Sequence, residues 1–358
     1  MRMANVEQLD YLIVGQGLAG TLLSHFLLLE NQRIKIVDTP GAASSSKIAA
    51  GIVNPVTGRR IAKSWRYEEL FPFAKKTYLE LEESLQIKIW QERNILRALH
   101  NNFEENEWLR RSAFPDYKPY FKAEANLDGF EGKIGESFAW GELCQSAQVD
   151  MPVLIRAFRE KLNLDQLLLE EDFDYQKINF KAGRVLYNSM SAKKIIFCEG
   201  AQAINNPYFN YLPFAVTKGE LLLVEIPGAR FEKMLKHHLF VVPLQNDLYW
   251  VGSTSRFDFA DGFPSVEMRQ WLEEELRKTI KIPFRIVNHL AGIRPTVFDV
   301  RPFLGVHPEH AGLAIFNGLG TKGASLGPFF ARQMTDFLLE KGILDKEVNI
   351  ERFQNKSV

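Results

Sequence analysis

Three glycines near the N-terminus have a spacing that suits phosphate binding. Gly15, Gly17 and Gly20 follow the apolar run 9–14 and open the apolar run 18–29. In this arrangement the first glycine permits a tight turn, the second lets backbone approach a pyrophosphate, and the third lets a helix pack against a strand. The helix start adds free N–H groups and partial positive charge. The pattern predicts a dinucleotide site, and the alternative is a strand–helix turn that binds nothing.

An acidic residue lies where such a site requires one. Asp38 comes 18 residues after Gly20 and closes a second apolar run, 33–37. A carboxylate there can accept hydrogen bonds from ribose hydroxyls, whereas a 2′-phosphate would favour arginine. The strand, helix and strand together make one βαβ unit. The residues expected to bind the ADP half of the dinucleotide are Gly15, Gly17, Leu18, Ala19, Gly20 and Asp38.

Composition restricts the class of protein that carries this unit. The chain has 358 residues, 46% hydrophobic and 25% charged, which fits an enzyme of two domains or one domain with a large insertion. Its 44 basic and 44 acidic residues balance, so no global field attracts nucleic acid or an anionic membrane. Cys144 and Cys198 lie far apart and form no CxxC pair, which argues against a disulfide scaffold or zinc cluster.

The same features indicate where the protein resides. The first ten residues lack the apolar stretch of a signal peptide, and the longest apolar runs, such as 221–224, are too short to span a bilayer. Paired-cysteine chemistry is missing, as in a reducing compartment. We therefore expect a soluble, cytoplasmic protein without a membrane span.

The order of the predicted elements is interrupted. Dinucleotide-type elements occur at both ends of the chain and near residue 195, and antiparallel-looking strands lie between them at 216–226, 239–242 and 248–252. This order predicts an α/β protein: a Rossmann-like domain assembled from discontinuous segments, with an inserted α+β substrate domain whose sheet is mostly antiparallel. The predicted domains are 1–80, 149–210 and 290–358 for the nucleotide, and 81–148 and 211–289 for the substrate.

Motifs farther along the chain identify the kind of dinucleotide. They are Ser44 to Gly51, Asn54-Pro55, Gly292-Ile293-Arg294-Pro295-Thr296, Asp299, Arg301-Pro302, Gly305 and a second glycine turn from Gly318 to Gly323. At these residues the sequence resembles the D-amino acid oxidase (DAO) family of FAD-dependent oxidoreductases, which includes glycine oxidase and sarcosine oxidase. The resemblance is strongest over 9–55, 194–201 and 290–340, and no motif matches from about 87 to 148. The resemblance implies that the dinucleotide is FAD, whereas the glycine loop alone does not distinguish FAD from NAD.

The resemblance also implies further cofactor-binding residues. These are Ser45, Ser46, Ala50, Gly51, Gly200, Gly292, Arg294, Gly318, Gly320, Thr321, Lys322 and Gly323. The helix expected to begin near Ser325 can direct N–H groups at the N1 and C2=O end of the flavin, which becomes negative on reduction. Lys322 either adds charge there or is a solvated loop lysine. Since the turn contains no histidine or cysteine, we expect non-covalent FAD.

The implied reaction is oxidation of a C–N bond of an amino acid or secondary amine, by hydride transfer to flavin N5. The arginine that matches Arg294 binds the substrate carboxylate, and a guanidinium offers the planar two-donor fork for that role. A structural pairing of Arg294 with Asp299 or with a loop carbonyl is the alternative. Tyr249 and Trp250 are also assigned to the substrate site, although they alternate on one strand and at most one faces the flavin. No catalytic residue beyond the flavin, and no general base, is assigned.

Trp250 stands where sarcosine oxidase has a lysine for the reaction with oxygen, so an oxidase and a dehydrogenase both remain open. A basic cluster of Arg59, Arg60, Lys63 and Arg66 is either a solvated surface or a site for an anionic substrate or RNA. The family includes the FAD domain of an enzyme that modifies wobble uridine in tRNA by oxidative removal of a carboxymethyl group. The neutral overall charge disfavours nucleic acid here.

Other interpretations also stay open. One is a non-catalytic flavin-binding protein, and another is an NAD enzyme. No metal site is expected, because the adjacent His237 and His238 would point to opposite faces of a strand. The particular amine, the electron acceptor and the oligomeric state are not determined by the sequence.

Overall fold

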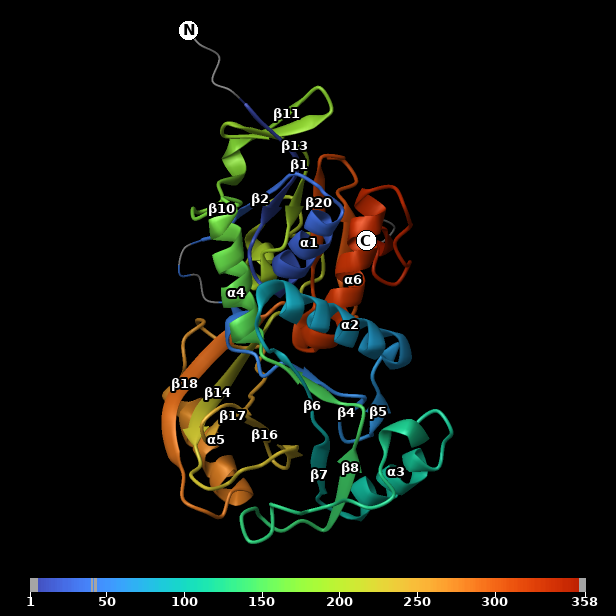
Figure 1. The fold of residues 1–358 in the computed structure, drawn as a ribbon, viewed down its shortest axis with the longest axis vertical. Helices are drawn as coiled ribbons and strands as arrows, with labels where there is room; N and C mark the ends of the chain where they lie inside the picture. Colours follow the sequence, from blue (N-terminus) through green and yellow to red (C-terminus); the bar gives the residue numbers. More distant parts are fainter. Residues whose placement is uncertain (1–5, 40, 42–43, 354–358) are drawn as a thin grey trace.

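The computed structural model describes residues 6–39, 41 and 44–353, and two large sheets dominate it (Figure 1). The first sheet has eight strands: β1 (Glu7–Val14), β2 (Ile34–Val37), β10 (Leu168–Leu169), β11 (Ile178–Lys181), β12 (Arg184–Tyr187), β13 (Met190–Phe197), β19 (Phe303–Val306) and β20 (Leu313–Asn317). Strands β10, β2, β1, β13 and β20 run parallel in that order. Their residues are mostly buried, as expected for a parallel sheet covered on both faces.

Helices cover the first sheet. They are α1 (Leu18–Leu29), α2 (Tyr67–Leu85), α4 (Met151–Leu164) and α6 (Gly323–Leu338). Helix α1 packs against α6, and nearly all of its residues are buried, which explains why its sequence is apolar on every side. Side chains of α1, α2, α4 and α6 form one core with β1 and β2, and a second core lies on the opposite face around Phe197, Phe209 and Phe303.

The second sheet has seven strands and lies in the lower half of Figure 1. Its order is β18 (Arg285–Arg294), β14 (Thr217–Glu225), β17 (Leu248–Gly252), β16 (Phe240–Pro243), β15 (Met234–Lys236), β7 (Ile95–Leu99) and β8 (Ala139–Leu143). All neighbouring strands are antiparallel except β15 and β7, which are parallel. Helix α5 (Val266–Thr279) covers one face through Leu272 and Leu276, and α3 (Asn102–Ser112) follows β7.

Smaller elements connect the two sheets. A three-stranded sheet contains β3 (Ile52–Val53), β9 (Ala147–Val149) and β6 (Trp90–Glu92), and a two-stranded ribbon contains β4 (Val56–Thr57) and β5 (Ala62–Lys63). Short 3₁₀ helices are η1 (Ser45–Lys47), η2 (Lys118–Tyr120), η3 (Tyr175–Lys177), η4 (Gly200–Asn205), η5 (Gly320–Lys322) and η6 (Ile350–Phe353). Apolar residues of this region, including Val56 and Ile61, pack against the face of the second sheet that α5 leaves free.

The predicted mixed α/β fold is confirmed, with one mostly parallel and one mostly antiparallel sheet. All strands of the first sheet fall within 1–80, 149–210 and 290–358. The second sheet takes β7 and β8 from 81–148 and β14 to β17 from 211–289, while β18 crosses the expected boundary at 290. Within the described residues, no helix combines the length and hydrophobicity that a membrane crossing requires.

Candidate active site

The ends of the parallel strands bring the two glycine turns together. Because β1, β2, β13 and β20 are parallel, their carboxyl ends lie at one edge of the sheet, where nucleotides bind in such folds. Gly15, Asp38 and Gly318 directly follow β1, β2 and β20, and Gly200 comes three residues after the end of β13. The Asn317 side-chain amide donates to the Gly200 carbonyl at 3.0 Å and so links two of these turns. Turns from opposite ends of the chain therefore form one site.

Backbone crowding explains two glycines of the first turn. Gly15 has φ +99°, and a Cβ there would lie 2.6 Å from the Cys198 carbonyl oxygen. A Cβ on Gly20 would lie 1.9 Å from the Gly15 carbonyl oxygen. Gly17 precedes α1 and supplies no side-chain cap, and of the first N–H groups of the helix the Leu18 N–H bonds to Ser46 Oγ, which leaves those of Ala19 and Gly20 for a ligand. The turn has the close backbone approach and the free donors that a pyrophosphate requires.

Asp38 lies beside this turn and is held in place by two partners. Its Oδ1 accepts from the Gln16 N–H at 2.9 Å, and its Oδ2 accepts from Arg159 Nη1 at 2.7 Å. Arg159 also donates to the Gln16 side chain at 3.1 Å and pairs with Glu170. The sequence did not indicate Arg159, because it comes from α4, 121 residues away, on a helix with no nucleotide motif.

The loop from Ser44 to Gly51, called the serine loop below, lies against the start of α1. Ser46 Oγ accepts from the Leu18 N–H at 3.1 Å, and a Cβ on Gly17 would lie 3.5 Å from Ser46 Oγ. A Cβ on Gly292 would lie 3.3 Å from Ser45 Cα, so β18 passes close to the same loop. Ala50 is buried in the core between the sheets. Gly51 is required for a different reason, since its Cβ would lie 1.8 Å from the Val149 carbonyl oxygen of β9.

The second glycine turn leads directly into α6. Gly318 has φ +76°, and η5 contains Gly320, Thr321 and Lys322. The helix begins at Gly323, two residues earlier than expected, and has no side-chain cap. Lys322 is partly buried, and burial, together with the nearby Arg301, lowers the pKa of its amine. A cation and an uncapped helix N-terminus thus lie at the same sheet edge as the first turn.

Arg294 lies on the face of the second sheet that contacts the serine loop. A Cβ on Gly219 would lie 1.9 Å from Arg294 Nη2, so the guanidinium extends across that glycine. It donates to Ser253 Oγ at 2.6 Å and to the Thr254 carbonyl at 3.2 Å. Asp299 instead pairs with Arg352 at 3.0 Å, so Arg294 does not use that alternative partner, whereas the other structural alternative, a loop carbonyl, is present in Thr254.

Of the two strand aromatics, only Trp250 lies on this face. Its Nε1 donates to the Ile48 carbonyl at 2.9 Å, next to the serine loop. Tyr249 lies on the opposite face, in the core that packs against α5, where its hydroxyl accepts from the Phe231 N–H at 3.2 Å. The assignment of Tyr249 to the substrate site is therefore corrected, because alternation along β17 directs its side chain away.

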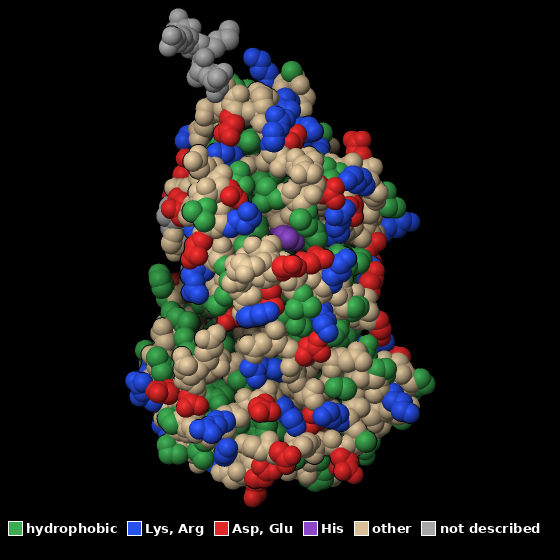
Figure 2. Space-filling view, viewed as in Figure 1, with side chains coloured by type: hydrophobic (Ala, Val, Ile, Leu, Met, Phe, Trp, Pro, Cys, Tyr) green, Lys and Arg blue, Asp and Glu red, His purple; other side chains and the backbone are tan. Residues whose placement is uncertain are grey.

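Two of the four residues of the predicted basic cluster are paired with carboxylates. Lys63 contacts Glu68 at 2.7 Å and Asp116 at 3.1 Å, and Arg66 pairs with two carboxylates, one of them on Asp345. On the face seen in Figure 2, lysine and arginine side chains alternate with aspartate and glutamate. Neither observation supplies the continuous basic stripe that RNA binding would favour.

The expectation for the adjacent histidines is wrong. His237 and His238 are not in a strand but in the turn between β15 and β16. A turn does not impose alternation, and both rings approach His100, with ring centroids 4.8 Å apart in each case. This cluster lies outside the glycine turns and belongs to a separate part of the second sheet.

Comparison with known proteins agrees with this geometry. Residues 10–337 match the model of the DAO family, described as FAD dependent oxidoreductase. The chain is 23% identical to the glycine oxidase of Pseudomonas aeruginosa, over 91% of this chain and 93% of that protein. The glycine oxidase of Bacillus licheniformis is likewise 23% identical, over 93% of this chain and 94% of that protein.

Solved structures share the fold. The glycine oxidase from Geobacillus kaustophilus superposes with a TM-score of 0.79 at 21% identity, covering 94% of this chain and 96% of that one. The iminodiacetate oxidase from Chelativorans sp. BNC1 gives a TM-score of 0.77 at 19% identity, covering 96% and 98%. Since the family model covers most of the chain, this protein is an enzyme of the DAO family of FAD-dependent oxidoreductases.

Proposed function

We propose that this enzyme oxidises a C–N bond in a small amine or amino acid that carries a carboxylate. When bound, FAD supplies the hydride acceptor, its N5 atom. Relatives with the same fold are named for glycine and iminodiacetate, which both join an amine to a carboxylate. The proposal concerns the substrate class. Its support is the positive charge of Arg294, which lies on the face of the second sheet beside the serine loop.

One observation carries the proposal: Arg294 is partly buried without a carboxylate partner. Among the described residues, no aspartate or glutamate lies within 4.0 Å of its guanidinium, and its two partners are a hydroxyl and a carbonyl. Burial lowers the pKa of Arg294, and no carboxylate of the described residues opposes this effect. A substrate carboxylate would supply that compensation, by two parallel hydrogen bonds to the guanidinium.

The remaining residues would hold the cofactor. The turn at Gly15, Gly17 and Gly20 would receive the pyrophosphate, and Asp38 the ribose hydroxyls. The uncapped start of α6 and the amine of Lys322 would stabilise negative charge at the pyrimidine end of the flavin. We assign no proton acceptor, because an amine that enters in its neutral form needs none on the protein.

The substrate class can be tested by anaerobic flavin bleaching. Purified holoenzyme is mixed with glycine, sarcosine, proline and D-amino acids, and with the matching amines that lack the carboxylate. We expect loss of the 450 nm absorbance only with carboxylates. Replacement Arg294→Ala should weaken the apparent affinity for the best substrate roughly 100-fold while flavin content stays unchanged, as for loss of a buried charged pair.

Arg285→Ala is the matched control. Arg285 lies on the same strand, β18, but is exposed and pairs with Glu225, so its removal should leave affinity unchanged. An unaltered affinity in Arg294→Ala would reject the proposed carboxylate contact. Persistent yellow colour with every amine, and with modified nucleosides, would instead favour a flavin-binding protein without this activity.

A further inference from the structure

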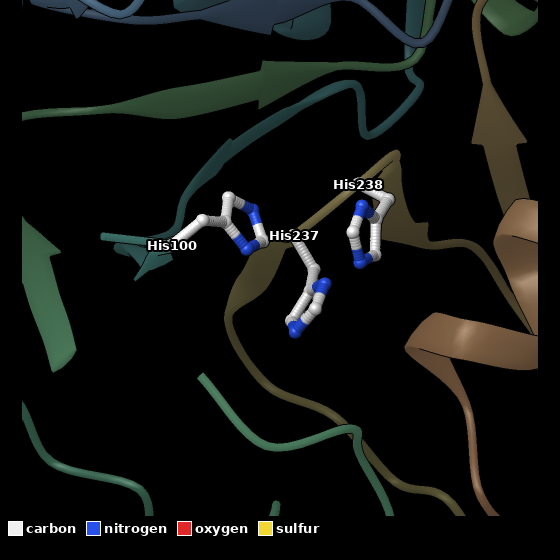
Figure 3. A group of neighbouring side chains, drawn as sticks. All are labelled: His100, His237 and His238. Atoms are coloured by element: carbon white, nitrogen blue, oxygen red, sulfur yellow. The ribbon is translucent and has the colours of Figure 1, made fainter. Parts of the chain in front are cut away.

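Three histidines of the second sheet form a compact cluster. His100 follows β7, and His237 and His238 lie in the turn between β15 and β16. Figure 3 shows the three rings side by side, with His100 on one segment and the other two on the turn. One ring nitrogen from each lies within 4.8 Å of the others, and ring centroids are 4.6 to 4.8 Å apart.

Strand direction explains why these residues meet. Strands β7 and β15 are the parallel neighbours of this sheet, with Arg97 opposite Lys236. Residues just beyond the carboxyl ends of parallel neighbours emerge at the same edge. The chain then turns back at once, because the His237 N–H donates to the Leu239 carbonyl at 3.0 Å. The turn thereby presents two consecutive histidines to the residue after β7.

The hydrogen bonds of the rings leave ligand atoms free. His237 is buried, and its Nε2 lies 3.2 Å from the Glu136 carbonyl, while its Nδ1 has no partner within the described part of the chain. His238 Nδ1 lies 3.3 Å from a Glu275 carboxylate oxygen. Ring nitrogens of metal-binding histidines commonly have such a carbonyl or carboxylate on the side opposite the metal. The unpartnered Nδ1 of His237 otherwise carries the cost of an unsatisfied buried polar atom.

The surroundings of the cluster carry charges of both signs. Lys236, Arg97, Arg59 and Lys278 are positive, and Glu104 and Glu275 are negative. The Glu136 carbonyl beside His237 Nε2 favours the neutral tautomer with its proton on Nε2, which leaves the Nδ1 lone pair for a metal ion. His100 and His238 are exposed, so their rings can turn toward a common centre while His237 stays fixed.

We propose that His100, His237 and His238 bind a divalent transition-metal ion, with zinc as the reference ion and water as the fourth ligand. Neutral imidazoles suit zinc, copper and nickel, and three of them would stand about 2.0–2.1 Å from zinc. Four strand spacings separate β15 from β18, which places the cluster roughly 19 Å across the sheet from the strand of Arg294. The ion would join the end of β7 to the β15–β16 turn, away from the flavin.

Zinc uptake by the holoenzyme tests this site. The protein is prepared without a histidine tag, treated with chelator, and titrated with zinc chloride by calorimetry and by equilibrium dialysis with metal analysis. We expect one zinc ion per chain with micromolar or tighter affinity. His100→Asn and His238→Asn should each weaken binding at least about 10-fold, and the double variant should abolish it.

His310→Asn is the matched control, since His310 is a partly buried histidine beside His307, on the first sheet's side of the molecule. It should bind zinc as the unmodified protein does. Because His100 and His238 are exposed, their variants should keep the flavin spectrum and the unfolding temperature measured without zinc. Zinc binding that is absent, or equal in the double variant and the unmodified protein, would overturn the proposal.

Discussion

We propose that the two sheets of this enzyme recognise small molecules by different means. At the edge of the parallel sheet, backbone N–H groups, glycines and helix starts would provide the contacts, and these lie within a few residues of each strand end. On the antiparallel sheet, side chains from separate strands would provide them. Arg294 on β18 crosses Gly219 on β14, and Trp250 on β17 reaches Ile48 of the serine loop.

The difference has a physical origin. Parallel strands place all their carboxyl ends at one edge, so each strand–turn–helix unit is a local device that its own sequence specifies. An antiparallel sheet offers a face, and its chemistry depends on which strands become neighbours and which residues share a side. We call the edge of the parallel sheet the first region and the antiparallel sheet the second region. Stability and ligand binding should therefore be most sensitive to backbone crowding in the first region and to loss of individual charges in the second. Three predictions test this contrast.

The largest effect is expected from Gly20→Ala in the first region. The new Cβ would lie 1.9 Å from the Gly15 carbonyl oxygen, so backbone must move in the turn that is to hold the pyrophosphate. We expect a loss of about 3 kcal/mol or more in unfolding free energy and mostly flavin-free protein. Urea unfolding and the ratio of absorbance at 450 nm to 280 nm measure the two effects.

Gly327→Ala provides the comparison, because Gly327 lies in α6, the helix packed against α1. There the new Cβ would crowd the end of the Leu22 side chain, at 2.7 Å, and meet Leu18 at an ordinary contact distance of 3.6 Å, so side chains rather than backbone must move. This variant should retain FAD and most of its stability. If both glycine variants behave alike, backbone crowding is not what distinguishes the first turn.

A smaller effect, confined to the second region, is expected from Glu142→Gln. Glu142 is fully buried and contacts Lys122 and Lys233, each at 2.9 Å. Burial alone would raise the pKa of Glu142, but these two cations, with hydrogen bonds from the Asn126 N–H and the Asn94 side chain, outweigh it and lower the pKa to about 2 from the ordinary 4.5. Removing the charge leaves two lysines uncompensated, so we expect about 3 kcal/mol less unfolding free energy at pH 7.

The contribution of Glu142 to the unfolding free energy should depend on pH. Because folding lowers the pKa of Glu142, its stabilisation is complete above pH 4.5 and disappears as pH falls toward about 2. The difference between the two proteins in urea unfolding should shrink over that interval. Glu267→Gln is the control, since Glu267 forms an exposed pair with Arg256 and should matter by less than about 1 kcal/mol. A difference that persists unchanged at pH 3 would contradict the assignment.

The smallest effect is expected from Arg159→Ala, which tests the tertiary contribution to the first region. Without this guanidinium, Asp38 loses its partner at 2.7 Å and Gln16 loses one at 3.1 Å. We expect FAD affinity to fall about 10-fold, the scale of one charge-assisted hydrogen bond. Fluorescence of released flavin during dilution measures it.

Arg156→Ala is the control. Arg156 lies one turn earlier on the same helix and is exposed, so its replacement should leave FAD affinity unchanged. A double variant with Asp38→Ala should lose little more than Asp38→Ala alone, because both residues act through one contact. Additive losses would show that Arg159 does not act by orienting Asp38.

Sequence reasoning found the local parts of the site. The strand 9–14, the glycine turn and the helix from Leu18 were predicted because each part constrains the next within a few residues. The second turn was also found, although its helix begins two residues earlier than expected because η5 closes the turn directly onto Gly323. Alternation along β17 predicted that only one of Tyr249 and Trp250 could face the flavin side, but only the packing of α5 showed which.

By itself the sequence determined the dinucleotide turn, the interrupted order of elements and, through its motifs, the FAD-dependent family. Only the tertiary structure decided that Arg159 holds Asp38, that Arg294 has no carboxylate partner among the described residues, and that three histidines meet. The physical reason is range: turn and helix preferences act between near neighbours in the chain, whereas these contacts depend on strand pairing between segments up to about 140 residues apart.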